Sequence, residues 1–372
     1  MDYAKRYRLM CPGPVNVSDR VARSMFGIEI GHRETEFSTL LREIRNNWLK
    51  IMGLSHEKYA FVAISGSGSA ANEAVICSAI SPDDVVLSLS TGEFGRRLGD
   101  ISAIYNPHTI CHHQDWATPL DLDAVEKILS AQHVDWVTMV HDETSTGELQ
   151  PIEAVGALCE KYGAKLFVDA VSSFMVDPID MEKSHIALLT TSSGKAIGMM
   201  PGLGLIVGER AVFERAKTLP VRNYYLNLPR LYSFYEEKEQ TPNTPAVSLF
   251  IALNEALRII LEEGVENRFA FQKAKTAHFR DGLRKIGLHV LHPDHVLSNA
   301  VTSIRLPDGL SFDFLRESLR ERGFIVYGGK GPLQNLTFQV STMGAVGIPD
   351  VDDLLDALAE ILSVSVIHQA TV

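Results

Sequence analysis

The chain has 372 residues, of which 35 are Lys or Arg and 46 are Asp or Glu, so its formal net charge is −11 with neutral histidines. A net-acidic chain has no diffuse attraction for nucleic acids or anionic membranes, and this composition argues against both as partners. Hydrophobic residues make up 45% of the chain and charged residues 22%, which excludes a largely disordered protein, and the length predicts about two domains.

The first two thirds of the chain alternate short β-branched runs with amphipathic segments of helical period. This alternation predicts βαβ units and a mainly parallel sheet, that is, an α/β fold. The predicted strands are Tyr59–Ile64, Asp84–Leu89, Trp136–His141, Lys165–Asp169, Ile186–Thr190 and Leu203–Val207. The helices predicted between them are Ser69–Ala79, Asp121–Ser130 and Ile152–Tyr162.

The pattern changes after residue 207. A polar, aromatic stretch, Asn223–Gln240, precedes an apolar-periodic segment, Pro245–Gly264, and a charged helix, Val265–Lys285. The last third has predicted strands and helices at Val301–Arg305, Ser311–Arg322, Phe324–Val326, Thr337–Ser341 and Asp350–Val364. We therefore expect a large α/β domain over residues 16–255 and a smaller α+β domain over 256–372, with residues 1–15 packed against it.

The cysteines and histidines give no sign of a staple or a metal centre. The four cysteines have neither a C-x-x-C spacing nor a repeated interval, which argues against a disulfide framework and a zinc site. The histidines lack ligand spacing, so we expect no metal. No apolar signal segment opens the chain, and no apolar run approaches the roughly 18 residues of a membrane span. The sequence thus predicts a cytoplasmic protein.

A glycine- and serine-rich turn, SGSGSAANEA, follows the first predicted strand and opens a helix. Free N–H groups at a helix N-terminus favour an anion, so Gly66, Ser67, Gly68 and Ser69 predict a phosphate site. The same glycines fit a dinucleotide-binding fingerprint, which raises a dehydrogenase as a rival. That rival needs a carboxylate at the end of the next strand, and none appears there before Glu93. A plain strand-to-helix turn is the structural alternative.

Two charged residues stand among small and apolar neighbours. Asp169 ends a fully apolar strand, where open α/β sheets place their ligands, although it is equally an N-cap candidate. Lys195 follows 26 positions later, in SSGKAIG. Desolvation lowers the pKa of an ammonium, as a lysine that forms a Schiff base requires. Together with the phosphate loop, these residues match the pyridine nitrogen, aldehyde and phosphate of pyridoxal phosphate.

These motifs, with HDETSTG from His141, VDAVSS from Val168 and MPGLGLIV from Met200, resemble the class V, fold-type I pyridoxal-phosphate aminotransferases in order and spacing. CPGPVN from Cys11 and GHRETEF from Gly31 match the N-terminal signature of that family. The resemblance spans essentially the whole chain. It is closest to 2-aminoethylphosphonate–pyruvate aminotransferases, with alanine– and serine–glyoxylate aminotransferases next.

The resemblance implies a role for each matching residue. Lys195 would form the Schiff base and then move the substrate proton, while Asp169 would keep the pyridine nitrogen protonated. The implied cofactor contacts are Ser67, Gly68 and Ser69 at the phosphate, Phe94 and Val171 on the two ring faces, Thr144 or Ser145 at the ring hydroxyl, with Ser172, Thr241 and Thr244 completing the set. Thr244 matches a residue that reaches the neighbouring subunit's phosphate, so the resemblance implies a homodimer with shared active sites.

Two departures from the family bear on the reaction. Gly194 stands where a Gln or Asn usually precedes the lysine, and Gln339 stands where an arginine clamps the substrate carboxylate or phosphonate. A glutamine amide cannot reproduce that charge-assisted pair, and Arg33, Arg222 or Lys330 are the candidate substitutes.

Two reactions therefore stay open. The first is transamination of a small amino substrate, an amino acid or one like 2-aminoethylphosphonate, with a keto acid as acceptor. The alternative is elimination, replacement or C–C bond formation at the β or γ carbon, for instance on S-adenosylmethionine. A cofactor-binding regulator is a third and weaker reading, because no DNA-binding segment is apparent.

Overall fold

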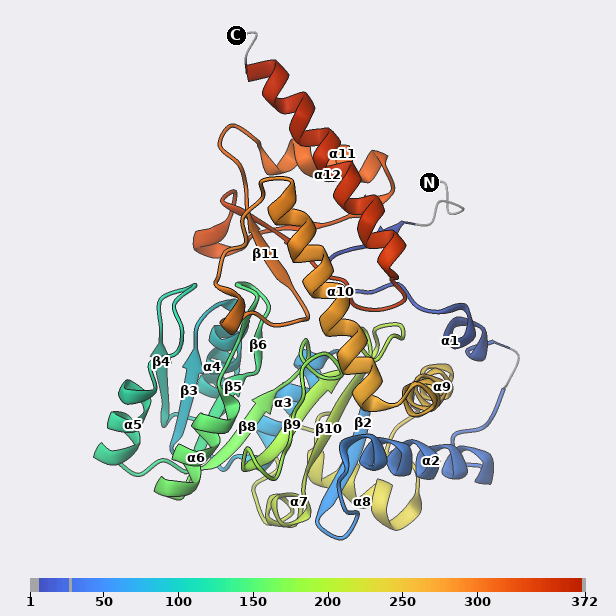
Figure 1. Cartoon of the computed structure of the whole chain (residues 1–372). Helices are drawn as coiled ribbons and strands as arrows, with labels where there is room; N and C mark the ends of the chain where they lie inside the picture. The colour runs from blue at the N-terminus through green and yellow to red at the C-terminus, as the bar shows by residue number, and fades with distance from the viewer. Residues whose placement is uncertain (1–6, 27–28, 370–372) are drawn as a thin grey trace.

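A seven-stranded sheet forms the centre of the protein in the computed structural model, which describes residues 7–26 and 29–369 (Figure 1). Its strand order is β2-β10-β9-β8-β5-β3-β4. The strands are β2 (Tyr59–Ser65), β3 (Val86–Ser90), β4 (Thr109–His113), β5 (Trp136–Val140), β8 (Lys165–Asp169), β9 (Ile186–Ser192) and β10 (Leu203–Glu209). Only β10 runs antiparallel to its neighbours, so the predicted mainly parallel sheet is confirmed.

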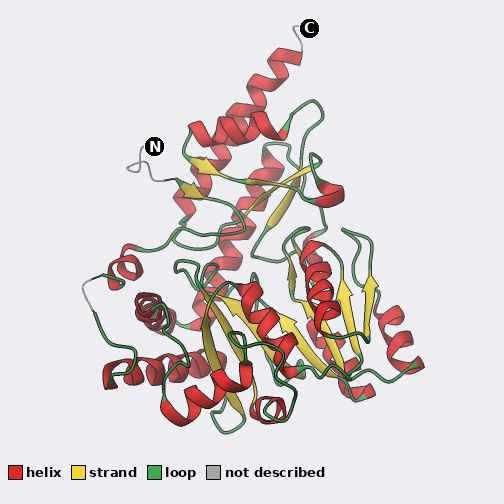
Figure 2. Ribbon diagram, turned by 180° about the vertical axis from the view of Figure 1, so that it is seen from behind, coloured by secondary structure: helices red, strands yellow, loops and turns green. Residues whose placement is uncertain are grey.

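Helices cover both faces of this sheet (Figures 1 and 2). Those of the first 263 residues are α1 (Asp19–Ser24), α2 (Thr35–Met52), α3 (Gly68–Ala79), α4 (Glu93–Tyr105), α5 (Leu122–Ala131), α6 (Ile152–Tyr162), α7 (Arg210–Ala216), α8 (Leu228–Lys238) and α9 (Val247–Glu263). Strands β2, β3, β5 and β9 are almost wholly buried between the helices, which explains their continuous apolar sequence. The edge strand β4 alternates exposed and half-buried residues and has no apolar run, so the sequence did not predict it.

A smaller unit lies above the sheet in Figure 1. It contains α10 (Val265–Lys285), α11 (Phe312–Glu321), α12 (Ile348–Gln369), and an antiparallel sheet of β11 (Thr302–Arg305), β14 (Thr337–Val340) and β13 (Tyr327–Gly328). Near the N-terminus, β1 (Arg8–Leu9) pairs in parallel with β12 (Phe324–Ile325). A short hairpin of β6 (Asp142–Glu143) and β7 (Glu148–Leu149) and two 3-10 turns, Asp294–Val296 and Gly331–Leu333, complete the described elements.

The apolar residues form two separate core clusters. In the larger one, the Trp48 ring stacks between the rings of Phe61 and Phe174, with centroids 4.7 and 4.6 Å away. The smaller one joins α10, α11, α12 and β14 and includes Met10 from the N-terminal segment. The predicted domain boundary at residues 255 and 256 falls inside α9, which packs in the larger cluster as far as Ile260. The division into residues 16–255 and residues 256–372 with 1–15 stays a prediction.

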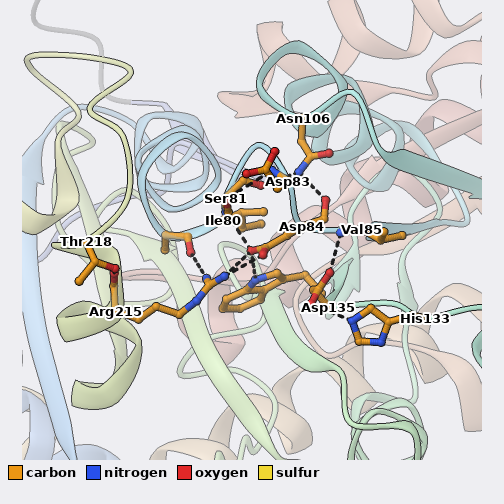
Figure 3. A network of polar contacts seen from close by, with 12 residues as sticks. Ile80, Ser81, Asp83, Asp84, Val85, Asn106, His133, Asp135, Arg215 and Thr218 are labelled. Carbon is orange, nitrogen blue, oxygen red and sulfur yellow. Dashed lines mark hydrogen bonds and ion pairs between the residues drawn. The ribbon is translucent and has the colours of Figure 1, made fainter.

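A polar network fixes the amino ends of β3 and β5 (Figure 3). The Asp84 carboxylate accepts hydrogen bonds from Ser81 N at 2.9 Å and Trp136 Nε1 at 3.1 Å, and Arg215 Nη2 lies 2.7 Å from it. Asn106 Nδ2 donates to the Ser81 and Asp84 carbonyl oxygens, both at 2.7 Å. Both oxygens of this buried carboxylate therefore have hydrogen-bond partners. The network thus holds the end of the sheet opposite the strand ends described next.

Candidate active site

The carboxyl ends of the parallel strands surround a cavity of about 290 Å³. Its lining brings together nine of the predicted site residues: Ser67, Gly68, Ser69, Phe94, Thr144, Asp169, Val171, Ser172 and Lys195. Segments more than 120 residues apart in the sequence therefore meet here, at the carboxyl ends of the strands, where open α/β sheets bind their ligands.

The glycine-rich turn places the N-terminus of the 12-residue helix α3 at the cavity wall. Ser67 is the N-cap and its Oγ accepts a hydrogen bond from Ala70 N at 3.4 Å. A Cβ at Gly68 would lie 2.6 Å from Val171 Cγ2, so only glycine allows the helix to approach the loop after β8 this closely. The free N–H groups and the serine hydroxyls form a site suited to a phosphate.

Lys195 lies in the turn after β9 and its side chain is covered by the N-terminal segment. Its Nζ donates a hydrogen bond to the Pro12 carbonyl oxygen. A Cβ at Gly13, whose φ is +141°, would lie 2.8 Å from Lys195 Cε. Burial lowers the pKa of the Lys195 ammonium, although Asp142, Cys11 and Asp169 oppose the shift. Burial thus makes the amine easier to deprotonate.

Asp169 ends β8, and a second polar residue holds its carboxylate. Asn72 Nδ2 donates to Asp169 Oδ2 at 2.6 Å, and Val171 N donates to Oδ1 at 2.8 Å. Thr190 Oγ1, on the neighbouring strand, donates to Asn72 Oδ1 at 2.5 Å and fixes the orientation of the amide. Burial raises the pKa of the Asp169 carboxyl, while these hydrogen bonds and Lys195 act to lower it. The sequence analysis did not single out Asn72, although it is a polar residue on the buried side of α3.

Two cationic side chains contact the Phe94 ring. The Arg97 guanidinium carbon and Lys330 Nζ each lie 4.7 Å from the ring centroid. Arg97 lines the cavity, and Lys330 lowers the pKa of Lys195, so its charge is felt there. This wall of the cavity is therefore positively charged.

Glu143 caps helix α4 from inside the protein. Its carboxylate accepts hydrogen bonds from Phe94 N at 3.2 Å, Gly95 N at 2.9 Å and Ser145 N at 3.1 Å. Ser145 Oγ donates to the same carboxylate and accepts a hydrogen bond from Glu93 N at 3.0 Å. The Ser145 hydroxyl is thus engaged at the helix terminus, and Ser145 is not among the residues that line the cavity. Glu143 positions Phe94, a role that only the three-dimensional arrangement reveals.

Thr144 and Gln339 meet beside the cavity. Thr144 Oγ1 and Ser172 Oγ are 2.7 Å apart, and Gln339 Nε2 donates to the Thr144 carbonyl oxygen. Gln339 is 1% exposed and its Nε2 also lies 3.4 Å from Ser303 Oγ. It contacts a cavity residue but does not line the cavity itself. A Cβ at Gly194 would lie 2.8 Å from Pro201 Cβ, so the missing side chain there leaves no open space on that side.

Four further predicted or candidate residues lie away from the cavity. Arg33 donates to Thr241 O at 2.6 Å and to Gln240 Oε1 at 3.1 Å, and Thr241 Oγ1 donates to Asn243 O at 2.8 Å. Thr244 is exposed in the same segment. Arg222 donates to the carbonyl oxygens of Tyr105, Ile76 and Ile80 and so ties α3 to α4. Of the three cations considered as anion-binding substitutes, only Lys330 lies near the cavity.

No group of three or more His, Cys, Asp or Glu side chains in residues 7–26 and 29–369 is arranged to hold a metal ion. No helix of the described chain has the length and apolar character needed to cross a membrane.

A mostly parallel sheet with a buried lysine, a carboxylate and a helix N-terminus at its strand ends defines the fold-type I class of transferases. The sequence pattern of one family places the chain more narrowly. The family described as Aminotransferase class-V matches residues 22–346, and the chain belongs to this family.

Individual relatives agree with this assignment. The chain is 35% identical to an uncharacterized aminotransferase of Methanocaldococcus jannaschii, over 92% of this chain and 89% of the relative. It is 31% identical to a 2-aminoethylphosphonate–pyruvate transaminase of Salmonella schwarzengrund, over 95% and 97% of the two chains. The crystal structure of an alanine–glyoxylate aminotransferase from Nostoc sp. superposes with a TM-score of 0.91 at 30% identity, covering 96% and 95%. These relatives support an aminotransferase and not the elimination, replacement or C–C bond-forming alternative.

Proposed function

We propose that this protein is a pyridoxal-phosphate-dependent aminotransferase that moves an amino group from a small amino substrate to a keto acid. The observation that carries the proposal is the meeting of Lys195, Asp169 and the N-terminus of α3 in one cavity. These are the three groups needed to hold an aldehyde, a pyridine nitrogen and a phosphate.

The residues present fit this cofactor. The cavity has an apolar side chain on each of two walls, Phe94 and Val171, which suits a flat ring. Each oxygen of Asp169 accepts one hydrogen bond from the protein and keeps a lone pair for a ring N–H. We propose Ser67, Gly68, Ser69, Phe94, Thr144, Asp169, Val171, Ser172 and Lys195 as the cofactor-binding residues of the chain's own cavity. Ser145 would act through the terminus of α4, and Thr241 and Thr244 would belong to the segment that reaches the neighbouring subunit's cofactor.

The chemistry that the cofactor supplies when bound is an electron-withdrawing ring that stabilises negative charge on the substrate carbon bearing the amino group. The Asp169 carboxylate holds a proton on the ring nitrogen, and Asn72 keeps that carboxylate oriented. The Lys195 amine would remove the proton from the substrate carbon that bears the amino group. It would then deliver a proton to the other carbon bonded to that nitrogen, which is the carbon of the cofactor's aldehyde group. The lowered pKa of Lys195 favours the neutral, basic form that this step requires.

The anionic end of the substrate or acceptor would lie at the Phe94 wall. Arg97 and Lys330 are the cations there, each 4.7 Å from the centroid of the Phe94 ring. We propose that they take over from the arginine that Gln339 replaces, with Arg33 assigned instead to the segment around Thr241. The donor is an amino acid or a compound like 2-aminoethylphosphonate, the substrate in the name of the Salmonella relative.

We further propose a cytoplasmic homodimer with shared active sites. Thr244 is exposed and lies outside the cavity of its own chain, as expected of a residue that reaches a neighbouring subunit. All four cysteines are free, and Cys11, Cys77 and Cys159 are buried, as is usual in a reducing compartment.

Replacement of Lys195 by Ala tests the proposed function. The wild-type protein should turn yellow with pyridoxal phosphate and should lose that colour when an amino donor converts the cofactor to its amine form. The Lys195→Ala protein should neither convert the cofactor nor form keto acid. Full turnover by this variant would exclude the proposal.

A further inference from the structure

Asp142 is a buried acid of the cavity wall without a full set of partners. It follows β5, lines the cavity and is 4% exposed. Its Oδ1 is buried and accepts no hydrogen bond from the described residues, while its Oδ2 receives the Thr144 hydroxyl at 3.4 Å and the Ser298 side chain acts to lower the pKa of the carboxyl. A buried carboxylate oxygen without a donor is costly, and such groups in folded proteins have partners or await them.

The cations near this carboxyl are each engaged elsewhere. Burial raises the pKa of Asp142 well above its usual value, and the acids Asp177 and Glu143 add to that rise. Lys195 is the cation that opposes it, and in the proposed enzyme its amine is committed to the cofactor. Arg280 also interacts electrostatically with Asp142, but its Nη2 and Nε donate to Ser298 O and Thr302 Oγ1. Asp142 Oδ1 is therefore open to a hydrogen-bond donor that enters the cavity.

The side chain behind Thr144 is also unable to bind an anion. Gln339 is neutral, and its Nε2 is used by the Thr144 carbonyl oxygen and Ser303 Oγ. The cations of the site, Arg97 and Lys330, are at the Phe94 wall. The cavity is therefore polarised, with positive charge at Phe94 and an unpaired acid at Thr144.

We propose that the amino donor carries a second cationic group, an ammonium or guanidinium, that pairs with Asp142. The substrate class is a basic amino acid or a diamine, with ornithine, lysine and putrescine as representatives. An approaching ammonium supplies the donor that Oδ1 lacks and favours the ionised carboxylate. This inference rests on the proposed function and narrows its substrate.

Pairs of donors of equal size test the charge alone. The wild-type holoenzyme is assayed with ornithine against norleucine, and with putrescine against pentylamine, where a methyl group replaces the second ammonium. We expect kcat/KM to be at least about 10-fold higher for the charged member of the pair that fits, the factor that about 1.4 kcal/mol of recognition gives. Glutamate is assayed as the acidic donor. Equal kcat/KM values within both pairs, or a higher kcat/KM for the neutral donors or for glutamate than for the charged donors, would overturn the inference.

Two variants then separate substrate recognition from a general effect. Asp142→Asn should lower kcat/KM for ornithine at least about 10-fold more than it lowers kcat/KM for norleucine, so that the preference for the charged donor is lost. Asp177→Asn is the matched control, because Asp177 is a nearby buried acid whose oxygens bond to Ser298 Oγ and Asn299, outside the cavity. Asp177→Asn should change kcat/KM for ornithine and for norleucine by the same factor.

A binding measurement gives a readout without turnover. In the cofactor-loaded Lys195→Ala protein, ornithine should raise Tm more than norleucine does, and Asp142→Asn should abolish the difference. If Asp142→Asn instead lowers kcat equally for every donor, Asp142 acts on the proton transfer and the inference fails. If the wild-type holoenzyme transaminates no donor at all, the proposed function fails. If it transaminates donors without preferring the charged ones, only the inference about Asp142 fails.

Discussion

Asn72 is the residue whose removal tests the proposed handling of the cofactor nitrogen. Asn72→Ala deletes the 2.6 Å hydrogen bond to Asp169 Oδ2 and leaves the Thr190 hydroxyl without its acceptor. Hydrogen bonds to charged groups are worth about 1.5 to 3 kcal/mol. Since the lost bond favours the ionised carboxylate, the pKa of Asp169 rises further and its anionic form pairs less well with a ring N–H.

The expected result is a lower affinity for the cofactor. At about 1.4 kcal/mol for each factor of ten, the dissociation constant of pyridoxal phosphate should rise about 10- to 100-fold. Titration of the cofactor-free protein by visible absorbance measures this constant. Thr190→Val should move it in the same direction by less, because Asn72 then stays in place but loses the group that orients it.

A second amide serves as the control. Asn47 Nδ2 donates to Asn254 Oδ1 at 3.2 Å, away from the cavity, so Asn47→Ala removes a neutral hydrogen bond worth about 1 kcal/mol. It should lower Tm without changing cofactor affinity. An Asn72→Ala protein that loses Tm like this control and keeps its cofactor affinity within about twofold would refute the role of Asn72.

Three further results are expected. Burial raises the pKa of Glu148 from 4.5 to about 7, so the folded state holds a proton that the unfolded state releases, and the free energy of unfolding falls as the pH rises between these two values. Glu148→Gln should reduce this fall by roughly 3 kcal/mol, as measured by urea titrations of the cofactor-free protein. Gly68→Ala should weaken cofactor binding because its Cβ meets Val171 Cγ2 at 2.6 Å, and the double variant with Val171→Ala should recover part of the loss. Lys330→Ala should raise KM for the keto acid more than it lowers kcat, since Lys330 provides charge at the Phe94 wall.

The sequence predicts those parts of the fold that depend on local pattern. Continuous apolar runs mark β2, β5 and β9 because both faces of these strands are covered. The edge strand β4 has a polar, partly exposed sequence. Each of its residues pairs with a residue of β3 that lies 23 positions earlier in the sequence. Edge pairing of this kind has no local signature.

The site divides in the same way. Ser67, Asp169 and Lys195 stand at strand ends beside turn residues, so their sequence context already indicates a ligand site. Glu143 and Asn72 act through partners 49 and 97 positions away, and nothing in their own neighbourhood distinguishes them from ordinary helix or loop residues. Residues that position other residues are therefore the part of a site that sequence reasoning misses.

The cover over Lys195 joins the two units of the protein. Pro12 and Gly13 contact the lysine, which lies 183 positions away from Pro12, while Met10 packs in the smaller core cluster. Met10 N donates to Ile325 O at 2.9 Å, and Ser341 N donates to Met10 O at 2.9 Å, so the segment is fixed to the smaller unit. Because burial lowers the pKa of Lys195 and this segment provides part of that burial, the basicity of the lysine depends on how the smaller unit sits on the sheet.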